Sequence, residues 1–235
     1  MGRTSTLPKR LQPMLATLTD KPFDDDEWLF EDKYDGFRMV ANIEGGKVTL
    51  YSRNGKIISD SYIEVAKALE GVKGEAVIDG ELVALDENGV SHFQLLQNAL
   101  RHEARLLYCA FDLMFQDGHD LRGFTLLERK KRLKSILPRH KLIEFSRHRK
   151  KSGTEFFEEA ERKGLEGIMA KRADSKYLSR SVRKSLLPGS RLQSGQDLSS
   201  ERLPSRCARI TAGGISVMLA LGSHTRCWRS CTAGS

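Results

Sequence analysis

The chain has 235 residues, of which 39% are hydrophobic and 30% are charged. This length suits one large domain with a sizeable core. No run of about 18 apolar residues indicates a membrane span, and residues 1–20 lack the apolar centre of a secretory signal. The four cysteines show neither a CxxC pair nor zinc-site spacing, which favours a cytoplasmic protein with reduced thiols and without structural metal.

The net charge of +8 is unevenly distributed along the chain. Residues 179–235 hold nine Lys/Arg and two acidic residues, whereas residues 1–178 hold 30 Lys/Arg and 29 acidic residues. The excess basicity therefore lies in the C-terminal part. Overall charge alone is consequently a weak argument for binding nucleic acid.

Strand and helix patterns alternate from Trp28 onward. Residues 47–53 alternate apolar and polar side chains before an Asn-Gly turn and predict a strand. Residues 61–71 predict a helix, with Ser61 and Glu64 in capping-box spacing. Residues 75–86 predict a strand in which Gly80 leaves room for a backbone or a ligand to approach closely.

The second half of this region continues the pattern. Residues 91–100 predict a short helix, residues 105–115 a buried strand, and residues 125–137 a helix that begins with a Thr-x-x-Glu capping box. A helix over 154–164 then leads into a strand over 165–172. Because strands and helices mix without a strict βαβ order, the predicted fold class is α+β with largely antiparallel sheets.

The composition changes after residue 178. Residues 179–235 contain no Phe and no Tyr, whereas the preceding residues contain all fifteen. Such a segment has little with which to build a core, and it is expected to be a disordered tail. Only residues 213–222 have the apolar character to pack as a strand or a helical turn.

Several predicted strands end in charged residues that a simple core does not require. Each one alone is usually a solvated surface charge or part of a turn. Around one cleft, the cations would face phosphates and the carboxylates would hold Mg²⁺ or a sugar hydroxyl. These residues are Lys33, Arg38, Arg53, Glu81, Glu166 and Lys171.

Five short motifs follow one another along the chain in this order: KYDGFR, SRNG, DGELV, FDLMF and EGIMAKR. Together with the lead-in LPKRLQPMLATLTDKPFDDDEWLFE, they resemble the nucleotidyltransferase motifs of ATP-dependent DNA ligases, and those of bacterial DNA ligase D in particular. The resemblance covers roughly residues 7–178. It implies an adenylation domain of the ATP-grasp-like nucleotidyltransferase type, with antiparallel sheets flanked by helices.

The resemblance implies a role for each matching residue. Lys33 would be the nucleophile that attacks the α-phosphate of ATP and forms lysyl-AMP. Glu31 and Asp32 would line the adenine pocket through their backbone groups, and Phe111 would stack on the base. A lysine amine attacks phosphorus only in its neutral form, so burial, nearby cations and a metal must favour that form. Asp35 is therefore expected to serve the structure through backbone hydrogen bonds.

The remaining matches would handle sugar, phosphates and metal. Arg38 and Glu81 would address the ribose and the neighbouring phosphate, with Arg53 nearby. Glu166 would help to bind Mg²⁺ or Mn²⁺, and Lys171 would lie near the phosphates. The implied partners are ATP, nicked or broken double-stranded DNA and Ku-like end-joining factors, for a monomer that works in the cytoplasm at the nucleoid.

Other enzymes with this lysine chemistry remain open. NAD-dependent ligases carry a nicotinamide-recognition domain and a four-cysteine zinc module, neither of which is visible in the sequence. RNA ligases and mRNA-capping enzymes share the lysine chemistry and stay possible alternatives. A catalytically inactive fragment that binds nucleotide or DNA is a further alternative.

The resemblance breaks after residue 178. In the family, a Trp-Leu-Lys-x-Lys strand and an OB-fold domain follow, whereas this chain reads LSRSVRKSLLPGSRLQSG. The expected division is a lead-in over 1–20, the adenylation domain over 21–178, and an aberrant tail over 179–235 in place of the last motif and the OB-fold. One hypothesis is that this tail is an out-of-frame translation of the family's own C-terminal region. Loss of the OB-fold would impair the sealing of DNA breaks.

Overall fold

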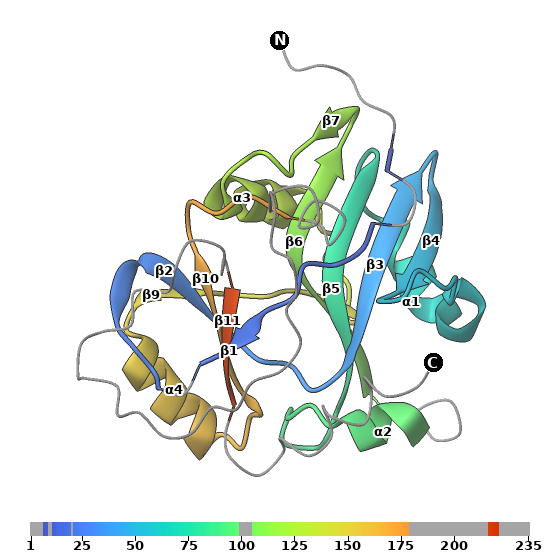
Figure 1. Cartoon of the computed structure of the whole chain (residues 1–235). Helices are drawn as coiled ribbons and strands as arrows, with labels where there is room; N and C mark the ends of the chain where they lie inside the picture. The colour runs from blue at the N-terminus through green and yellow to red at the C-terminus, as the bar shows by residue number, and fades with distance from the viewer. Residues whose placement is uncertain (1–6, 9–10, 20, 99–104, 179–215, 221–235) are drawn as a thin grey trace, which may run out of the picture.

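The computed structural model describes residues 7–8, 11–19, 21–98, 105–178 and 216–220. Within these residues, two β-sheets lie side by side and run through the centre of the molecule (Figure 1). The first sheet has the strand order β1-β11-β10-β2-β9. Its strands are β1 (Thr17–Leu18), β2 (Asp25–Asp32), β9 (Arg149–Lys151), β10 (Gly167–Arg172) and β11 (Ser216–Ala220).

The second sheet has the strand order β4-β3-β5-β6-β7, and β8 also pairs with β6. All strand pairs are antiparallel except β1 with β11 and β6 with β8. The predicted α+β class with largely antiparallel sheets is confirmed. The strands are β3 (Phe37–Glu44), β4 (Lys47–Ser52), β5 (Ala76–Leu85), β6 (Arg105–Gln116), β7 (His119–Asp120) and β8 (Ile143–Phe145).

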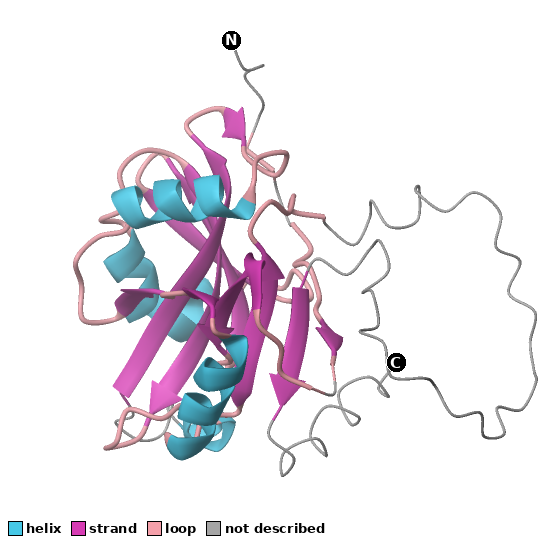
Figure 2. Ribbon diagram, turned by 90° about the vertical axis from the view of Figure 1, so that its left-hand side faces the viewer, coloured by secondary structure: helices cyan, strands magenta, loops and turns pink. Residues whose placement is uncertain are grey.

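The helices lie on the outside of the strands (Figure 2). Helix α1 packs against β4, α2 against β5, α3 against β6, and α4 against β2 and β10. Among the described residues, no helix combines the length and apolar character needed to cross a bilayer. The helices are α1 (Ile63–Leu69), which follows the 3₁₀ turn Ser59–Tyr62, α2 (Phe93–Asn98), α3 (Leu126–Ile136) and α4 (Gly153–Arg162).

Every helix and strand that the sequence predicts before residue 178 has a counterpart in the structure. The capping box of α3 is present, because Thr125 accepts from the Glu128 amide and the Glu128 side chain accepts from the Thr125 amide. The capping box predicted for Ser61 and Glu64 is wrong. Ser61 lies in the 3₁₀ turn, so Tyr62 is the N-cap of α1 and caps without a side-chain hydrogen bond.

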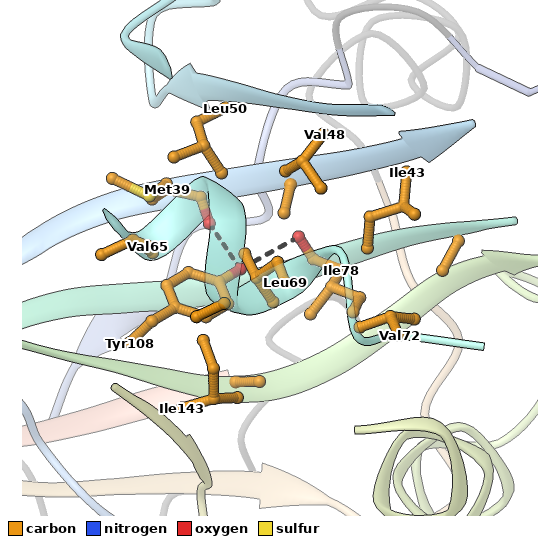
Figure 3. Packing of buried hydrophobic residues seen from close by; sticks show 14 of the residues in the cluster. Met39, Ile43, Val48, Leu50, Val65, Leu69, Val72, Ile78, Tyr108 and Ile143 are labelled. Carbon is orange, nitrogen blue, oxygen red and sulfur yellow. Dashed lines mark hydrogen bonds between the residues drawn. The ribbon is translucent and has the colours of Figure 1, made fainter. Parts of the chain in front are cut away.

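The largest core cluster lies between the second sheet and α1 (Figure 3). At its centre, the Tyr108 hydroxyl is within hydrogen-bonding distance of the carbonyls of Met39 and Ile78, at 3.2 and 3.3 Å. Gly80 lies against the same ring, and a Cβ built there would lie 2.5 Å from Tyr108 Cζ. The close approach predicted at Gly80 therefore exists, but the approaching group is an aromatic side chain of the core.

One piece of the predicted tail belongs to the first sheet. Residues 213–222 are predicted to pack as a strand or a turn, and Ser216–Ala220 forms β11 between β1 and β10. Val217 and Leu219 are buried with Trp28 and Ile168 in a second core cluster. The rest of the prediction for residues 179–235 lies outside the described residues.

Candidate active site

One pocket is lined by residues from both sheets. It brings together nearly all of the residues that the sequence singles out, although they come from six separate segments. Glu166 does not line it but contacts Lys33, which does. The predicted residues in the lining are Glu31, Asp32, Lys33, Arg38, Arg53, Glu81, Phe111 and Lys171.

Lys33 directly follows β2 and is anchored to the start of β10. Its amide donates to the carbonyl of Gly167 at 3.0 Å, and its amine forms an ion pair with the carboxylate of Glu166. The two side chains are 12% and 17% exposed, so a molecule in the pocket can reach the amine. Glu166 therefore pairs with the predicted nucleophile, a contact that the sequence did not indicate.

Asp35 forms hydrogen bonds with residues at the start of α2. Its carboxylate accepts from the amide of Phe93 at 3.0 Å, and its own amide donates to Ser91 Oγ at 3.0 Å. These bonds fix the turn after Lys33 to the start of α2. The prediction that Asp35 serves the structure through backbone hydrogen bonds is confirmed.

Glu31 lines the pocket and is the centre of a buried charge cluster. Its carboxylate accepts from Lys130 Nζ and Lys171 Nζ, both at 2.9 Å, and from Ser146 Oγ at 3.0 Å. Burial alone would raise the pKa of Glu31, but the charges of Lys130 and Lys171 outweigh it and lower the pKa to about 2. Glu31 therefore stays ionised, and its side chain holds Lys171 at the pocket wall.

Arg38 is fixed by a second buried carboxylate. Its guanidinium forms two hydrogen bonds to Asp79, at 2.7 and 2.8 Å, and the Tyr177 hydroxyl donates to the same carboxylate at 2.6 Å. Burial disfavours the charge of Arg38, yet Asp79 raises its pKa above the ordinary value. The guanidinium is thus a permanently charged, preorganised group in the pocket lining.

Phe111 forms an apolar part of the pocket wall. Arg38 Cζ lies 4.4 Å and Lys171 Nζ lies 4.3 Å from the centre of its ring. Cations so placed are attracted by the ring electrons. The pocket therefore offers an aromatic ring and two cations within a few ångströms of one another, which suits a ligand that combines a flat base with phosphates.

The acidic side chains near Lys33 are the candidates for holding a cation. Burial raises the pKa of Glu81 to about 7, and the Arg38 charge opposes this rise. Among the described residues, no group of three or more His, Cys, Asp or Glu side chains could hold a metal ion. Mg²⁺ is commonly bound by only one or two protein carboxylates together with substrate phosphates. Glu166 and Glu81 could supply these two carboxylates.

Four buried charged residues at the site were missed in the sequence: Asp79, Asp112, Arg129 and Lys130. Arg129 makes two hydrogen bonds to Asp112, at 2.7 and 2.9 Å, and both line the pocket. Arg129 and Lys130 look like surface charges within the run ERKKRLK, but they lie three and four residues after Leu126 on α3. That spacing puts them on the buried face of the helix and was the available signal.

The pocket wall beside β10 is formed by β11. Ser216 and Met218 of this strand line the pocket, together with Met169, which pairs with Met218 in register. The sequence of Ser216–Ala220 is SVMLA, so this strand supplies the pocket with a hydroxyl and apolar atoms and with no cation. The described cations of the lining come instead from β3, β10, α3, the loop after β4 and the residue that directly follows β2.

Comparison with known proteins matches the chain to one family and a consistent set of relatives. The family described as "ATP dependent DNA ligase domain" matches residues 13–187. The multifunctional non-homologous end joining protein LigD of Pseudomonas aeruginosa is 38% identical over 185 residues, which cover 76% of this chain and 22% of that protein. The LigD protein of Mycobacterium tuberculosis is 35% identical over 169 residues, with 71% and 22% covered.

Solved structures agree with this match. A structure of mycobacterial DNA ligase D complexed with ATP and MES is 32% identical, with a TM-score of 0.67, and the match covers 73% of this chain and 57% of that one. The ligase domain of M. tuberculosis LigD gives 33% identity and a TM-score of 0.65. The chain spans about a fifth of the length of the curated LigD relatives. The resemblance read from the five motifs is confirmed, and the chain belongs to the ATP-dependent DNA ligase family.

Proposed function

We propose that this chain carries out the first step of DNA ligation, the transfer of AMP from ATP to Lys33. The observation that carries the proposal is the partly exposed Lys33 amine in a pocket that also holds an aromatic ring and fixed cations. In this step a bond forms between Lys33 Nζ and the α-phosphorus, and the bond from that phosphorus to pyrophosphate breaks. Lys33 gives up two protons in all. The ammonium loses one before the attack, which the contacting carboxylate of Glu166 can accept and pass on to solvent, and the nitrogen loses the second to solvent once its bond to phosphorus has formed.

The pocket residues divide into those for the base and those for the phosphates. Phe111 is 7% exposed and can stack on adenine. Glu31 and Asp32 line the same pocket, and in this proposal their backbone groups contact the base. Lys171 and Arg38 are held by buried carboxylates and can stabilise negative charge without first being ordered. Arg53 also lines the pocket, on the side of the phosphates in this proposal.

A divalent cation fits this scheme as a companion of the nucleotide. Bound Mg²⁺ or Mn²⁺ would draw electron density from the phosphate oxygens and ease the displacement. Glu166 would hold the cation after leaving Lys33, and Glu81 would address the ribose or the same cation. Both assignments rest on the carboxylate chemistry and on the position of the two side chains near the amine.

The later steps of ligation are proposed for the same site. AMP would pass from Lys33 to a 5′-phosphate at a nick or break in duplex DNA, and a 3′-hydroxyl would then displace it. The LigD relatives are named for non-homologous end joining, so DNA ends and Ku-like factors are the partners to test.

A second candidate is a nucleotide-binding chain without turnover. The observation that favours it is β11, which borders the pocket with Ser216 and Met218 and brings no cation to the phosphates. In that case ATP would bind between Phe111 and the fixed cations, and Lys33 would stay paired with Glu166.

Labelling with nucleotide distinguishes the candidates. The full chain is incubated with α-labelled ATP and Mg²⁺ or Mn²⁺, and acid-labile label on the protein is measured. Label is expected on the parent and on Lys56→Ala, an exposed control, and is expected to be lost in Lys33→Ala. ATP binding without label would establish the inactive candidate, and label from GTP alone would indicate capping-type chemistry.

A further inference from the structure

A second hollow lies on the surface between the end of α3 and β8, away from the lining of the nucleotide pocket. Its floor is apolar, with Ile143 and Phe145 from β8. Its rim is basic. The charged and titratable residues of the lining are Lys134, Arg139, His140, Arg147, His148 and one acidic residue, Glu144.

The charge of this region differs sharply from that of the rest of the domain. Residues 129–151 contain eleven Lys/Arg and one acidic residue. The other 155 residues of 1–178 contain 19 Lys/Arg and 28 acidic residues. The balanced charge of residues 1–178 therefore conceals a strongly basic segment on an otherwise acidic domain.

Three basic side chains of the rim have no acidic partner in the part of the chain that the structure describes. Within the described ranges, no carboxylate lies within 4.0 Å of Lys134, Arg139 or Arg147, and all three side chains belong to exposed residues. By contrast, Arg149 and Lys151 in the same segment pair with Glu159 and Asp26. The three rim cations are thus available to an external anion.

The hollow adjoins the nucleotide pocket through one buried residue. Lys130 Nζ lies 4.8 Å from the centre of the Phe145 ring and 2.9 Å from Glu31, so it stands between the two. Phe145 belongs to the lining of the hollow, and Glu31 to the lining of the pocket. The two linings are therefore separated by one buried side chain.

We propose that this basic hollow, defined by Lys134, Arg139 and Arg147, binds the phosphate backbone of duplex DNA. The inference rests on the proposed function, which makes duplex DNA the substrate. Contacts from Lys and Arg to phosphates fix the position of a duplex but carry no sequence information. The hollow would thus add affinity and orientation for DNA ends of any sequence.

Salt dependence tests the proposal, because each neutralised phosphate adds about 0.9 to the slope of log affinity against log salt. Binding of a fluorescent nicked duplex is measured by anisotropy, without ATP, over a range of salt concentrations. The variant replaces Lys134, Arg139 and Arg147 by Gln. The control replaces Lys21, Lys47 and Lys56 by Gln, which removes the same charge from exposed positions elsewhere.

Both variants keep the basic residues 179–235, so that part's contribution to binding is common to all the proteins compared. We expect the hollow variant to lose about 2 to 3 from the salt slope and the control to lose less than about 1. Equal losses in the two variants would overturn the proposal. An equal loss for single-stranded RNA would overturn its assignment to duplex DNA, since it would reveal a general polyanion surface.

Thermal unfolding and ATP labelling accompany the binding measurement. Lys134 lies in the last turn of α3, where a cation also offsets the helix dipole, so folding must be checked in each variant. Self-adenylation of the hollow variant is expected to equal that of the parent. If labelling fails in all proteins while the salt slopes differ as expected, the proposed function fails and the DNA surface stands.

Discussion

Removal of the Lys130 amine is expected to destabilise the fold more than removal of any exposed lysine. Lys130 is 1% exposed and donates to Glu31 at 2.9 Å and to the carbonyl of Ser146 at 2.9 Å. Lys130→Met keeps much of the side-chain volume but leaves the Glu31 carboxylate, which is 2% exposed, with one lysine in place of two. The Ser146 carbonyl also loses its partner.

The size of the loss follows from the charge left behind. Removing one partner of a buried ion pair costs about 3–5 kcal/mol, because the remaining charge stays desolvated. Lys171 and Ser146 Oγ still bind Glu31, so the lower value of about 3 kcal/mol is expected. For a chain of this length, about 3 kcal/mol corresponds to a fall in Tm of about 6–12 °C.

Thermal unfolding measured by circular dichroism or calorimetry provides the assay. The control is Lys67→Met, which breaks an exposed pair with Glu64 whose side chains are 63% and 76% exposed. Its cost is expected to stay below about 0.5 kcal/mol. In the double variant Glu31→Gln, Lys130→Met, the loss should be smaller than the sum of the two single losses. A Tm for Lys130→Met within about 1–2 °C of the control would show that the buried Glu31 carboxylate does not need the charge of Lys130.

Four further changes test other parts of the fold. Glu31→Gln removes a carboxylate whose charge stabilises the fold above pH 4.5, and this stabilisation is lost as the pH falls through the pKa of about 2. The difference in Tm between parent and variant should therefore shrink as the pH is lowered over that range. Glu81 has a raised pKa of about 7, so the parent protein loses stability as the pH rises from 4.5. The Tm of Glu81→Gln relative to that of the parent should therefore increase between pH 5 and pH 8. A difference in Tm that stays constant over this range would contradict the expectation. Gly80→Ala forces a Cβ to within 2.5 Å of Tyr108 Cζ and should lower the unfolding free energy by about 1–3 kcal/mol, whereas a neutral result would show that the ring can move. Thr125→Ala removes the cap of α3 and should lower the unfolding free energy by about 1 kcal/mol, to be measured in denaturant with Thr125→Ser as the conservative control.

Local sequence patterns predicted the elements that depend on local physics. The strand over 105–115 is β6 because its apolar run is long enough to cross the core, and α3 begins where Thr125 and Glu128 can cap it. The Ser61 and Glu64 spacing is the same pattern without the same outcome. There the chain first forms a 3₁₀ turn, which moves the helix start past Ser61.

Contacts between distant segments could not be read from the sequence. Glu31 reaches Lys130 and Lys171 across 99 and 140 residues, and no local spacing signals that one carboxylate will hold both. The pairing of Glu166 with Lys33 likewise depends on β10 lying beside β2. The five motifs gave the residues of the pocket, whereas the buried partners that orient them required the fold.

The proposed function requires that Lys33 Nζ is the atom that receives AMP. The most direct measurement is mass spectrometry of the intact chain after incubation with ATP and Mg²⁺, followed by mapping of the modified peptide. We expect a mass increase of one AMP on the peptide that contains Lys33, absent from Lys33→Ala and present in Lys56→Ala. An unmodified chain that nevertheless binds ATP, or AMP attached to another residue, would contradict it.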